Sequence, residues 1–457
     1  MQTENVMKNT RLLAALTTVL LLQLGCKKDP PVVPPIEPPP YQQTVFLSVA
    51  DSGLTEVYLK LSMTDTLPPR EYSILRNNVQ ILSGSLFGRE TTLVDTTAQR
   101  NTSYFYQAFR QENAINKDSS NTVTTKTLDT TSHNFIWQLF TLGDGNASVV
   151  FDVAIIDENN IWVVGDINYL DSTGLNYVRY SAAHWDGVQW KKIQIRYKTV
   201  GGDTLVLAPI RGIVYFSERD IWFAAGSIFH WESNSSLAEL VHSRLQNPEP
   251  FPFYEKLYGA SNRDIYFVGY NGSLLHYDGG TWQRLVSGTT LDIYDVHGDF
   301  NNTTKEFEII AVAAKLFENS EHKVIKIQGT TATQLSDSGL VGPQNGVWFK
   351  AGKQYYIVGN GIYQSPHILV KPAWERLSRS ITMYYTNDVD GNDLNDVVAC
   401  GSFGELLHFN GATWKSFRTS IPGNSNNEYE RIKQKGNIVV SVGWQSPRGV
   451  VAIGKRN

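Results

Sequence analysis

The feature that most constrains the fold of this chain is a short motif that recurs along its C-terminal part. The motif reads His, aromatic residue, Asp or Asn, Gly, two variable residues and Trp, and it occupies residues 184–190, 276–282 and 408–414. A partial copy begins at His230, so successive histidines lie 46, 46 and 132 residues apart, and 132 is three times 44. Two further copies are therefore expected between residues 276 and 408. A fixed period of this length is the signature of a repeat architecture.

A second shared element precedes the copies of this motif. It consists of a polar turn residue, an apolar strand and, in most copies, a glycine. Clear examples occupy residues 160–165, 220–226, 264–269 and 396–401, and weaker versions occupy 307–312, 354–359 and 437–443. Together these segments predict seven units of about 40 to 60 residues, each built from several short strands.

Units of this length without helical stretches predict an all-β fold, a seven-bladed β-propeller over residues 134–457 in which each unit is a four-stranded blade. The Asp-Gly or Asn-Gly pair of the motif predicts a type I′ hairpin turn, with positive φ at both central residues. The Trp after the turn is expected to lie on the next strand and to wedge between blades. Burying about 150 Å² of its surface at about 25 cal/mol per Å² would stabilise a blade by roughly 4 kcal/mol.

The two ends of the repeat region predict how the ring closes. The last apolar segment, residues 448–454, resembles a third strand with no fourth strand after it, whereas the segment 135–140 parallels residues 281–286 from inside the repeats. We therefore predict that 135–140 completes the seventh blade, since a closed ring leaves no exposed edge.

The first forty residues indicate export and membrane attachment. Lys8 and Arg11 precede an apolar run at 12–24, which is short for a bilayer span of about 20 apolar residues and typical of a secretion signal. The run ends at Leu-Gly-Cys26, which resembles the lipobox of bacterial lipoproteins and implies a signal peptide over 1–25 and an acylated Cys26. The alternative is an uncleaved N-terminal anchor. The Pro-rich stretch within 26–40 predicts a stiff tether.

Residues 41–129 show the pattern of a small β-domain. Val57, Leu59 and Leu61 alternate with Tyr58 and Lys60, which is the period of strands with one buried face. The segments 101–108 and 121–125 resemble the last two strands of a fibronectin type III domain, and Tyr104 falls where that family places a tyrosine whose hydroxyl bonds to nearby backbone. The resemblance implies a sandwich that acts as a spacer or adhesive module, to which we assign no chemistry.

The order of these segments, together with residues 129–137 and 152–162, is similar to that of a bacterial lipoprotein family of the Bacteroidetes type. Its members combine a fibronectin type III-like domain with a C-terminal β-propeller, and the resemblance covers nearly the entire chain. Some members carry the label glucosyl transferase, but this sequence lacks the βαβ pattern of a nucleotide-sugar fold. The resemblance implies a lipid-anchored protein of the outer membrane, and the short charged stretch 27–29 adds exposure at the cell surface as a hypothesis.

Charge and cysteine content exclude several classes of function. The chain has 40 basic and 44 acidic residues, a net charge of −4, which offers no general attraction for nucleic acid. Its two cysteines are Cys26 and Cys400, so a thiolate zinc site is excluded. Cys400 lies in an apolar run and is predicted to be a buried core residue.

The histidines of the repeat do not predict a metal site. His184, His230, His276 and His408 occupy equivalent positions on different blades. Positions spread around a ring cannot converge within about 2 Å of one ion, so structural hydrogen bonding is expected instead. We predict no metal, no cofactor and no catalytic residue.

The candidate ligand-binding residues lie on loops of the propeller. The longest loop, 166–181 in the first blade, holds Tyr169, Tyr177, Arg179 and Tyr180, and the ring places Trp444 and Tyr270 on the same face. Aromatic faces with a few polar groups suit sugar rings or peptide segments. The alternative is a loop that is ordered by its own aromatic side chains.

The sequence thus predicts an extracytoplasmic, membrane-anchored protein whose propeller binds a protein or glycan partner without catalysis. The rival function is a carbohydrate-active enzyme, a glycosidase or glycosyltransferase-like protein. A glycosidase would require two carboxylates about 5 to 10 Å apart in a pocket of the propeller face. A scaffold for an envelope assembly is a third hypothesis.

Overall fold

The computed structural model describes residues 43–64, 70–112, 115–199, 201–246, 251–316, 321–366 and 373–456. The predicted signal peptide, Cys26 and the tether lie outside these residues. Regular structure in the described part is β-strand, apart from three short 3₁₀ segments, η1 (Arg244–Gln246), η2 (Ser402–Gly404) and η3 (Asn424–Asn426). None of the described helices has the length and apolar content that a membrane crossing requires.

Two sheets precede residue 127 and share an apolar core. Leu59 and Leu61 of one sheet and Ile74 and Tyr106 of the other belong to the same buried cluster. The hydroxyl of Tyr104 accepts a hydrogen bond from the backbone N–H of Gln99 at 2.8 Å. The first sheet has the order β1 (Val45–Ser52), β2 (Val57–Met63), β5 (Glu90–Asp95), and the second contains β4 (Val79–Leu86), β3 (Arg70–Arg76), β6 (Ser103–Glu112), β7 (Ile115–Ser119) and, paired with β6, β8 (Val123–Lys126).

Seven sheets follow in the described part of the chain after residue 134, and their strands pair antiparallel except for one parallel pair in the second sheet. The first contains β10 (Val149–Asp157), β11 (Asn160–Leu170), β12 (Tyr177–Trp185) and β13 (Trp190–Ile193). The second contains β16 (Gly212–Ser217), β17 (Asp220–Ala225), β18 (Ser227–Trp231) and β19 (Leu237–His242), extended by β14 (Arg196–Lys198) and β15 (Thr204–Val206). The third contains β20 (Phe253–Ser261), β21 (Asp264–Tyr270), β22 (Leu274–Tyr277) and β23 (Trp282–Arg284).

The copies expected between residues 276 and 408 are present as two complete sheets. The fourth sheet contains β24 (Asp292–Asn301), β25 (Glu306–Ala314), β26 (His322–Gln328) and β27 (Thr331–Leu335), and the fifth contains β28 (Gln344–Lys350), β29 (Gln354–Gly359), β30 (Gly361–Ser365) and β31 (Glu375–Arg376). The sixth contains β32 (Thr386–Asp393), β33 (Asp396–Gly401), β34 (Leu406–Phe409) and β35 (Trp414–Ser416). The seventh contains β36 (Glu428–Lys435), β37 (Ile438–Gln445), β38 (Arg448–Arg456) and β9 (Phe135–Leu142).

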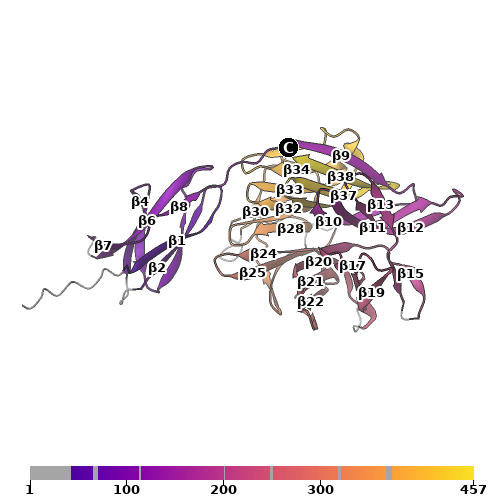
Figure 1. The fold of residues 1–457 in the computed structure, drawn as a ribbon, viewed down its shortest axis with the longest axis horizontal. Helices are drawn as coiled ribbons and strands as arrows, with labels where there is room; N and C mark the ends of the chain where they lie inside the picture. Colours follow the sequence, from indigo (N-terminus) through magenta and orange to yellow (C-terminus); the bar gives the residue numbers. More distant parts are fainter. Residues whose placement is uncertain are drawn as a thin grey trace, which may run out of the picture. The chain divides into compact units, whose positions relative to one another are not determined.

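The seven sheets close into a propeller. The first strand of each sheet contacts the first strand of the next, and β36 of the last sheet contacts β10 of the first. Strand β9 pairs antiparallel with β38 from Gly449↔Leu142 to Arg456↔Phe135, and Figure 1 shows the purple β9 beside the yellow β38. The N-terminal segment of the ring therefore supplies the fourth strand of the last sheet.

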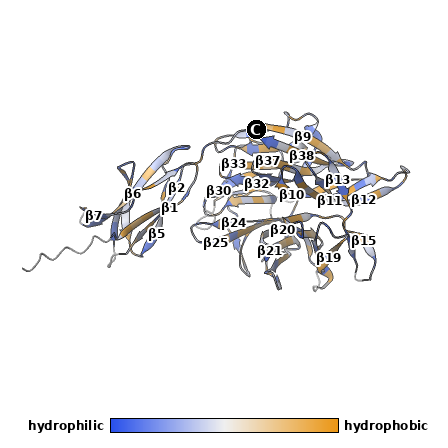
Figure 2. Cartoon of the chain, viewed as in Figure 1, coloured by the Kyte–Doolittle hydropathy of each residue, from blue (hydrophilic) through white to orange (hydrophobic). Residues whose placement is uncertain are grey.

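Apolar side chains fill the spaces between neighbouring sheets. Val440 and Val451 of the seventh sheet pack in one cluster with Val163 and Trp185 of the first. Figure 2 shows apolar residues along the strands of the sheets and hydrophilic residues at many of their turns. This alternation is what the period of a strand with buried faces requires.

The tryptophans of the repeat do wedge between blades. Each lies at the start of the outermost strand of its sheet and contacts an aromatic ring of the preceding sheet. The ring centroids are 6.1 Å apart for Trp190 and Phe140, 6.1 Å for Trp282 and Trp222, and 6.3 Å for Trp414 and Tyr356.

The turn before each tryptophan is not the predicted type I′ hairpin. The glycines at 187, 279 and 411 have positive φ, but the Asp or Asn before each of them does not. Trp185 pairs with Trp190, so the loop has four residues rather than two. The carboxylate of Asp186 accepts the N–H groups of Val188 and Gln189 at 3.0 and 2.9 Å, and this side-chain turn explains the recurring Asp or Asn.

The repeated histidines are structural. Each donates a hydrogen bond from Nε2 to the side-chain oxygen of the polar residue that starts the second strand of its own sheet. The pairs are His184–Asn160 at 2.8 Å, His230–Asp220 at 3.0 Å, His276–Asp264 at 2.7 Å and His408–Asp396 at 2.9 Å. This contact links the histidine of the hairpin motif to the polar residue that begins the second repeated element.

Acidification is expected to weaken the propeller at His133, just before β9. Its Nδ1 lies 2.8 Å from Nδ1 of His408, and burial and this second ring lower the pKa of His133 to about 4. The unfolded chain therefore binds more protons than the folded chain between pH 6.5 and 4, so the unfolding free energy falls as the pH is lowered through this range. Urea unfolding from pH 7 to pH 4 should show a shallower decline in His133→Gln; an identical pH profile would contradict the assignment.

The glycine that follows the apolar run of the second strand has a steric cause. In five sheets it lies opposite a β-bulge at the start of the first strand, where the bulged backbone approaches closely. A Cβ built on Gly269 would lie 1.8 Å from the carbonyl oxygen of Phe253, and one on Gly443 would lie 1.9 Å from that of Glu428. The glycine therefore recurs because the bulge of the neighbouring strand leaves no room for a Cβ.

Replacing Gly443 with alanine is expected to destabilise the protein by about 1 to 3 kcal/mol, because the added methyl group forces the bulged strand outward. Gly201→Ala is the control, since the nearest atom to its added Cβ would be Thr199 Oγ1 at 3.7 Å. Urea unfolding measures both variants. Equal stability of the two would show that the bulge tolerates a Cβ.

Candidate functional site

Bulges at the same position place one extra side chain of six sheets at the axis of the propeller. A β-bulge adds one residue to a strand and changes the direction in which a side chain points. The register shifts in six sheets fall at equivalent positions near the start of the first strand. The bulged residues are Phe151, Glu255, Tyr294, Asn345, Asn387 and Glu430, and Arg211 precedes the corresponding strand β16 of the second sheet. All seven line a single cavity.

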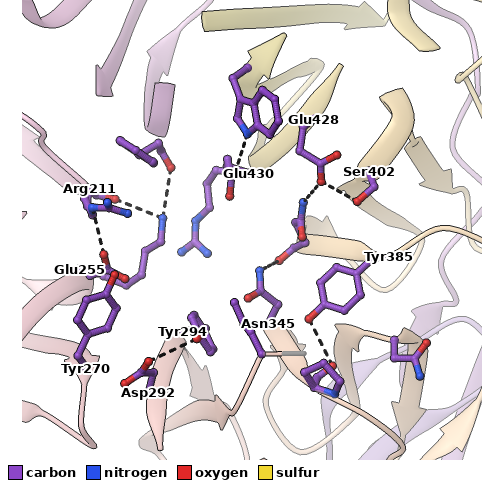
Figure 3. A pocket seen from close by; sticks show the side chains of 18 residues that line it. Arg211, Glu255, Tyr270, Asp292, Tyr294, Asn345, Tyr385, Ser402, Glu428 and Glu430 are labelled. Carbon is purple, nitrogen blue, oxygen red and sulfur yellow. Dashed lines mark hydrogen bonds and ion pairs between the residues drawn. The ribbon is translucent and has the colours of Figure 1, made fainter. Parts of the chain in front are cut away.

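This axial cavity has a volume of about 770 Å³, within the range of ligand pockets in proteins. Besides the seven bulge-position residues, its wall includes Tyr270, Asp292, Tyr385, Ser402, Glu428 and Trp444. Figure 3 shows carboxylates, amides and aromatic rings on the cavity wall. The site therefore draws on every blade of the ring.

The residue after each bulge position forms a second layer, from which Lys256 and Arg431 reach the cavity wall. In ring order this layer consists of Asp152, Gly212, Lys256, Asp295, Gly346, Asp388 and Arg431. Arg431 is its centre: its guanidinium lies 2.6 Å from Asp295, 3.1 Å from Asp388 and 3.5 Å from Asp152, and its side chain is 5% exposed. One arginine thus joins carboxylates from three other sheets.

These aspartates also connect neighbouring blades. The second carboxylate oxygen of each accepts a backbone N–H from the first strand of the next sheet. The bonds are Asp152 to Ile213 at 3.1 Å, Asp295 to Val347 at 3.0 Å and Asp388 to Ile432 at 2.9 Å. Burial raises the pKa of Asp388 to about 6, although Arg431 acts in the opposite direction.

Two positions further along the first strands, side chains of neighbouring sheets contact one another. The rings of Tyr258 and His297 lie 5.7 Å apart, and those of His297 and Trp348 lie 6.3 Å apart. Lys433 Nζ lies 3.6 Å from Asp390. None of these five residues lines the axial cavity.

One ion pair and two hydrogen-bonded groups organise the carboxylates of the cavity (Figure 3). Arg211 Nε lies 3.1 Å from Glu255, and Glu428 accepts bonds from Asn387 at 3.0 Å and Ser402 at 2.6 Å. Trp444 Nε1 donates to Glu430 at 3.1 Å. Burial raises the pKa of Glu430.

Lys256 is held without a carboxylate. Its Nζ donates to the carbonyl oxygens of Phe151 at 3.2 Å and Arg211 at 3.3 Å. Burial lowers the pKa of this lysine. It belongs to the same layer as Arg431, and both side chains line the cavity.

The structure divides the six binding residues predicted from the sequence into two groups. Tyr270 and Trp444 line the axial cavity, whereas Tyr169, Tyr177, Arg179 and Tyr180 do not. The latter four belong to strands β11 and β12. Their role in binding stays a prediction.

The predicted loop 166–181 is mostly a β-hairpin. Strands β11 and β12 continue to the pair Leu170↔Tyr177. Tyr169 and Tyr180 pack edge to face at 5.7 Å, with Lys192 Nζ 4.3 Å from the ring centre of Tyr169. Arg179 pairs with Asp166 at 2.8 Å, and Tyr177 is 45% exposed. Backbone pairing and aromatic contacts therefore hold the hairpin together.

The axial residues lie outside the second strand and the hairpin motif, the two repeated elements from which the blades were predicted. A signal was available in the first strands, where a polar residue or glycine precedes Val, Ile or Leu in each copy. Examples are Asp152-Val153, Lys256-Leu257 and Arg431-Ile432. In the described residues, no three His, Cys, Asp or Glu side chains form a group suited to a metal ion.

Comparisons with known proteins support the fold. No family model matches the chain, and a search of curated proteins finds no match. The solved structure "YCF48 bound to D1 peptide" is similar with a TM-score of 0.51 and 16% identity, over 72% of this chain and 99% of that chain. YCF48 from Cyanidioschyzon merolae (TM-score 0.49, 15% identity, 69% and 98% covered) and the WD40 propeller domain of Doa1 (0.46, 12%, 71% and 98%) are further similar structures. The first of these similarities shows an all-β, propeller-like fold.

Proposed function

We propose that this protein is a membrane-anchored, extracytoplasmic binding protein whose propeller holds a segment of a protein partner at the axial cavity, without catalysis. The observation that carries the proposal is the cavity itself: every sheet contributes a side chain to one space of about 770 Å³. A similar propeller, YCF48, has been solved with a bound peptide. An extended peptide suits such a cavity. The polar groups and aromatic rings of the cavity wall can contact both the backbone amides and the side chains of the peptide.

The proposed anchor is a lipid on Cys26, with the Pro-rich stretch as a tether to the outer membrane. The proposed role of the sheets before residue 127 is that of a fibronectin type III-like spacer. The hydrogen bond from Gln99 to the Tyr104 hydroxyl supports this assignment. Cys26→Ala should abolish labelling by an alkyne-tagged fatty acid and release the protein from membranes; retained labelling would contradict lipidation at this residue.

Replacing Trp444 with alanine is expected to weaken partner binding at least tenfold with little change in melting temperature. Trp444 is 37% exposed and lies on the cavity wall, so its ring is available to a ligand. The assay measures binding to partner proteins that were identified by cross-linking in cells and then purified. Tyr177→Ala tests the hairpin of the first blade in the same assay. Loss of binding only in Tyr177→Ala would move the site to the hairpin.

The rival function, a carbohydrate-active enzyme, also has a test in the cavity. The wall contains four carboxylates, and the pKa of Glu430 is raised by burial, as a general acid requires. If the protein hydrolyses nitrophenyl glycosides and Glu430→Gln abolishes this hydrolysis, the protein is a glycosidase and the proposal of a non-catalytic binding protein is wrong. Turnover that survives this substitution would not come from the axial cavity.

A further inference from the structure

The axial cavity has an excess of acidic groups. The cavity wall and the layer beneath it contain seven carboxylates, from Asp152, Glu255, Asp292, Asp295, Asp388, Glu428 and Glu430, but three cations, from Arg211, Lys256 and Arg431. Arg431 is already shared by three of these aspartates, and Arg211 is paired with Glu255. A ligand therefore meets a negative potential, which the low dielectric of a cavity strengthens.

Neighbouring carboxylates repel one another in and beneath the cavity. Burial raises the pKa of Glu430 and Glu428 adds to the rise, whereas a hydrogen bond and neighbouring cations act in the opposite direction. Burial raises the pKa of Asp388 to about 6 and Asp295 adds to the rise, whereas Arg431 acts in the opposite direction. A cation bound in the cavity would relieve both repulsions.

The aromatic part of the wall suits the same kind of ligand. Phe151, Tyr270, Tyr294, Tyr385 and Trp444 all line the cavity. Arg211 already lies over the ring of Phe151, with its guanidinium carbon 4.4 Å from the ring centre. Ring faces next to carboxylates attract ammonium and guanidinium groups.

An apolar rim adjoins the acidic wall at the sixth sheet. Phe403 directly follows the cavity residue Ser402 and is 58% exposed, and Met383 is 84% exposed two residues before the cavity residue Tyr385. The rings of Tyr384 and Phe403 lie 5.4 Å apart. Arg418 donates to the carbonyl oxygen of Phe403 at 2.8 Å and lies 4.7 Å from the ring centre of Tyr384, which braces this rim.

The backbone of Phe403 is strained. Its φ is 59° and its ψ is 34°, the left-handed region that a residue with a Cβ adopts at a cost. Neighbouring Gly404 also has positive φ, and a Cβ there would lie 2.0 Å from the carbonyl oxygen of Asn424. Strain that holds a large apolar side chain in solvent beside a cavity points to a ligand contact.

We infer that the propeller recognises a peptide segment that places a lysine or arginine side chain in the axial cavity and an apolar side chain against Phe403 and Met383. The inference rests on the proposed function and specifies the chemistry of its partner. The acidic cavity favours a basic residue of the peptide by charge complementarity. The strained, exposed Phe403 favours an apolar residue next to it in the peptide.

The test uses the full chain and a synthetic library of randomised heptapeptides, acetylated and amidated so that no terminus carries charge. Enriched peptides should contain Lys or Arg with an apolar residue close by. Replacing that basic residue with Gln should weaken binding at least tenfold, and so should Glu430→Gln or Glu428→Gln in the protein. Glu375→Gln, an exposed carboxylate of β31, should leave binding unchanged.

Phe403→Gly separates a ligand contact from a structural role. It should weaken binding of the enriched peptide about tenfold while the melting temperature stays equal or rises, because glycine adopts this φ freely. Phe307→Ala, at an exposed phenylalanine of β25, should leave binding unchanged. A lower melting temperature with unaltered binding would make Phe403 a structural residue and overturn its part in the site.

The remaining outcomes distinguish the two proposals. Enrichment of acidic or uncharged peptides would overturn the inference and leave the proposed peptide binding intact. No enrichment by the folded protein would overturn the proposed function together with it.

Discussion

Deleting residues 134–142 is expected to abolish cooperative unfolding of the propeller. The deletion removes β9, which pairs with β38 over eight residue positions. It also removes the rings of Phe135 and Trp137, which pack against Phe417 at 5.8 and 5.4 Å. The last sheet would keep three strands and an open edge, so the ring would lose its closure. Differential scanning calorimetry should show a broad transition without a single sharp peak.

A synthetic peptide of residues 134–142 provides the matched control. Added in excess to the truncated protein, it should restore a sharp transition, since binding to the folded state stabilises that state. A scrambled peptide of the same composition should not. A sharp transition in the truncated protein without any peptide would contradict the role of β9 in closing the ring.

Replacing Arg431 with methionine is expected to destabilise the protein by about 3 to 5 kcal/mol, the usual cost of removing one partner from a buried ion pair. The substitution leaves Asp152, Asp295 and Asp388 buried around one point without a cation. Arg179→Met is the matched control, because Arg179 is 49% exposed and pairs with a surface carboxylate at 2.8 Å. Its loss should cost at most about 1 kcal/mol in urea unfolding.

The pH dependence of Arg431→Met has a defined sign. Without the guanidinium the pKa of Asp388 should rise further above its ordinary value, having already been raised to about 6 by burial. A carboxylate whose folded pKa exceeds its unfolded pKa stabilises the fold when protonated, so the variant should regain stability as the pH falls from 7 to 5. Adding Asp295→Asn and Asp388→Asn should restore part of the loss at pH 7. A variant as stable as the parent would show that Arg431 does not balance these aspartates.

The overall fold was largely predictable from local patterns. The spacing of the histidines gave the positions of the hidden copies, and the segment 135–140 was found by its likeness to residues 281–286. Cys400 is buried with no exposed surface, as its apolar neighbours predicted. These features depend on the alternation of apolar residues within single strands, which the sequence displays directly.

Local geometry was harder to predict than the order of strands. An Asp-Gly pair can make a type I′ turn, but Asp186 uses its side chain to bond two N–H groups of a four-residue turn instead. The stretch 166–181 looked like a loop because it is polar, yet cross-strand contacts such as that between Tyr169 and Tyr180 extend it as a hairpin.

By itself the sequence determined that this chain repeats a short antiparallel sheet and closes the last copy with a strand from the start of the region. The tertiary structure decided which side chains meet at the axis. Phe151 and Glu430 are far apart in the chain and share no motif, but the β-bulges in their strands direct both side chains toward the same cavity. The charged groups of that cavity and of the layer beneath it come from six sheets, and they act together because the fold brings them within a short distance of one another.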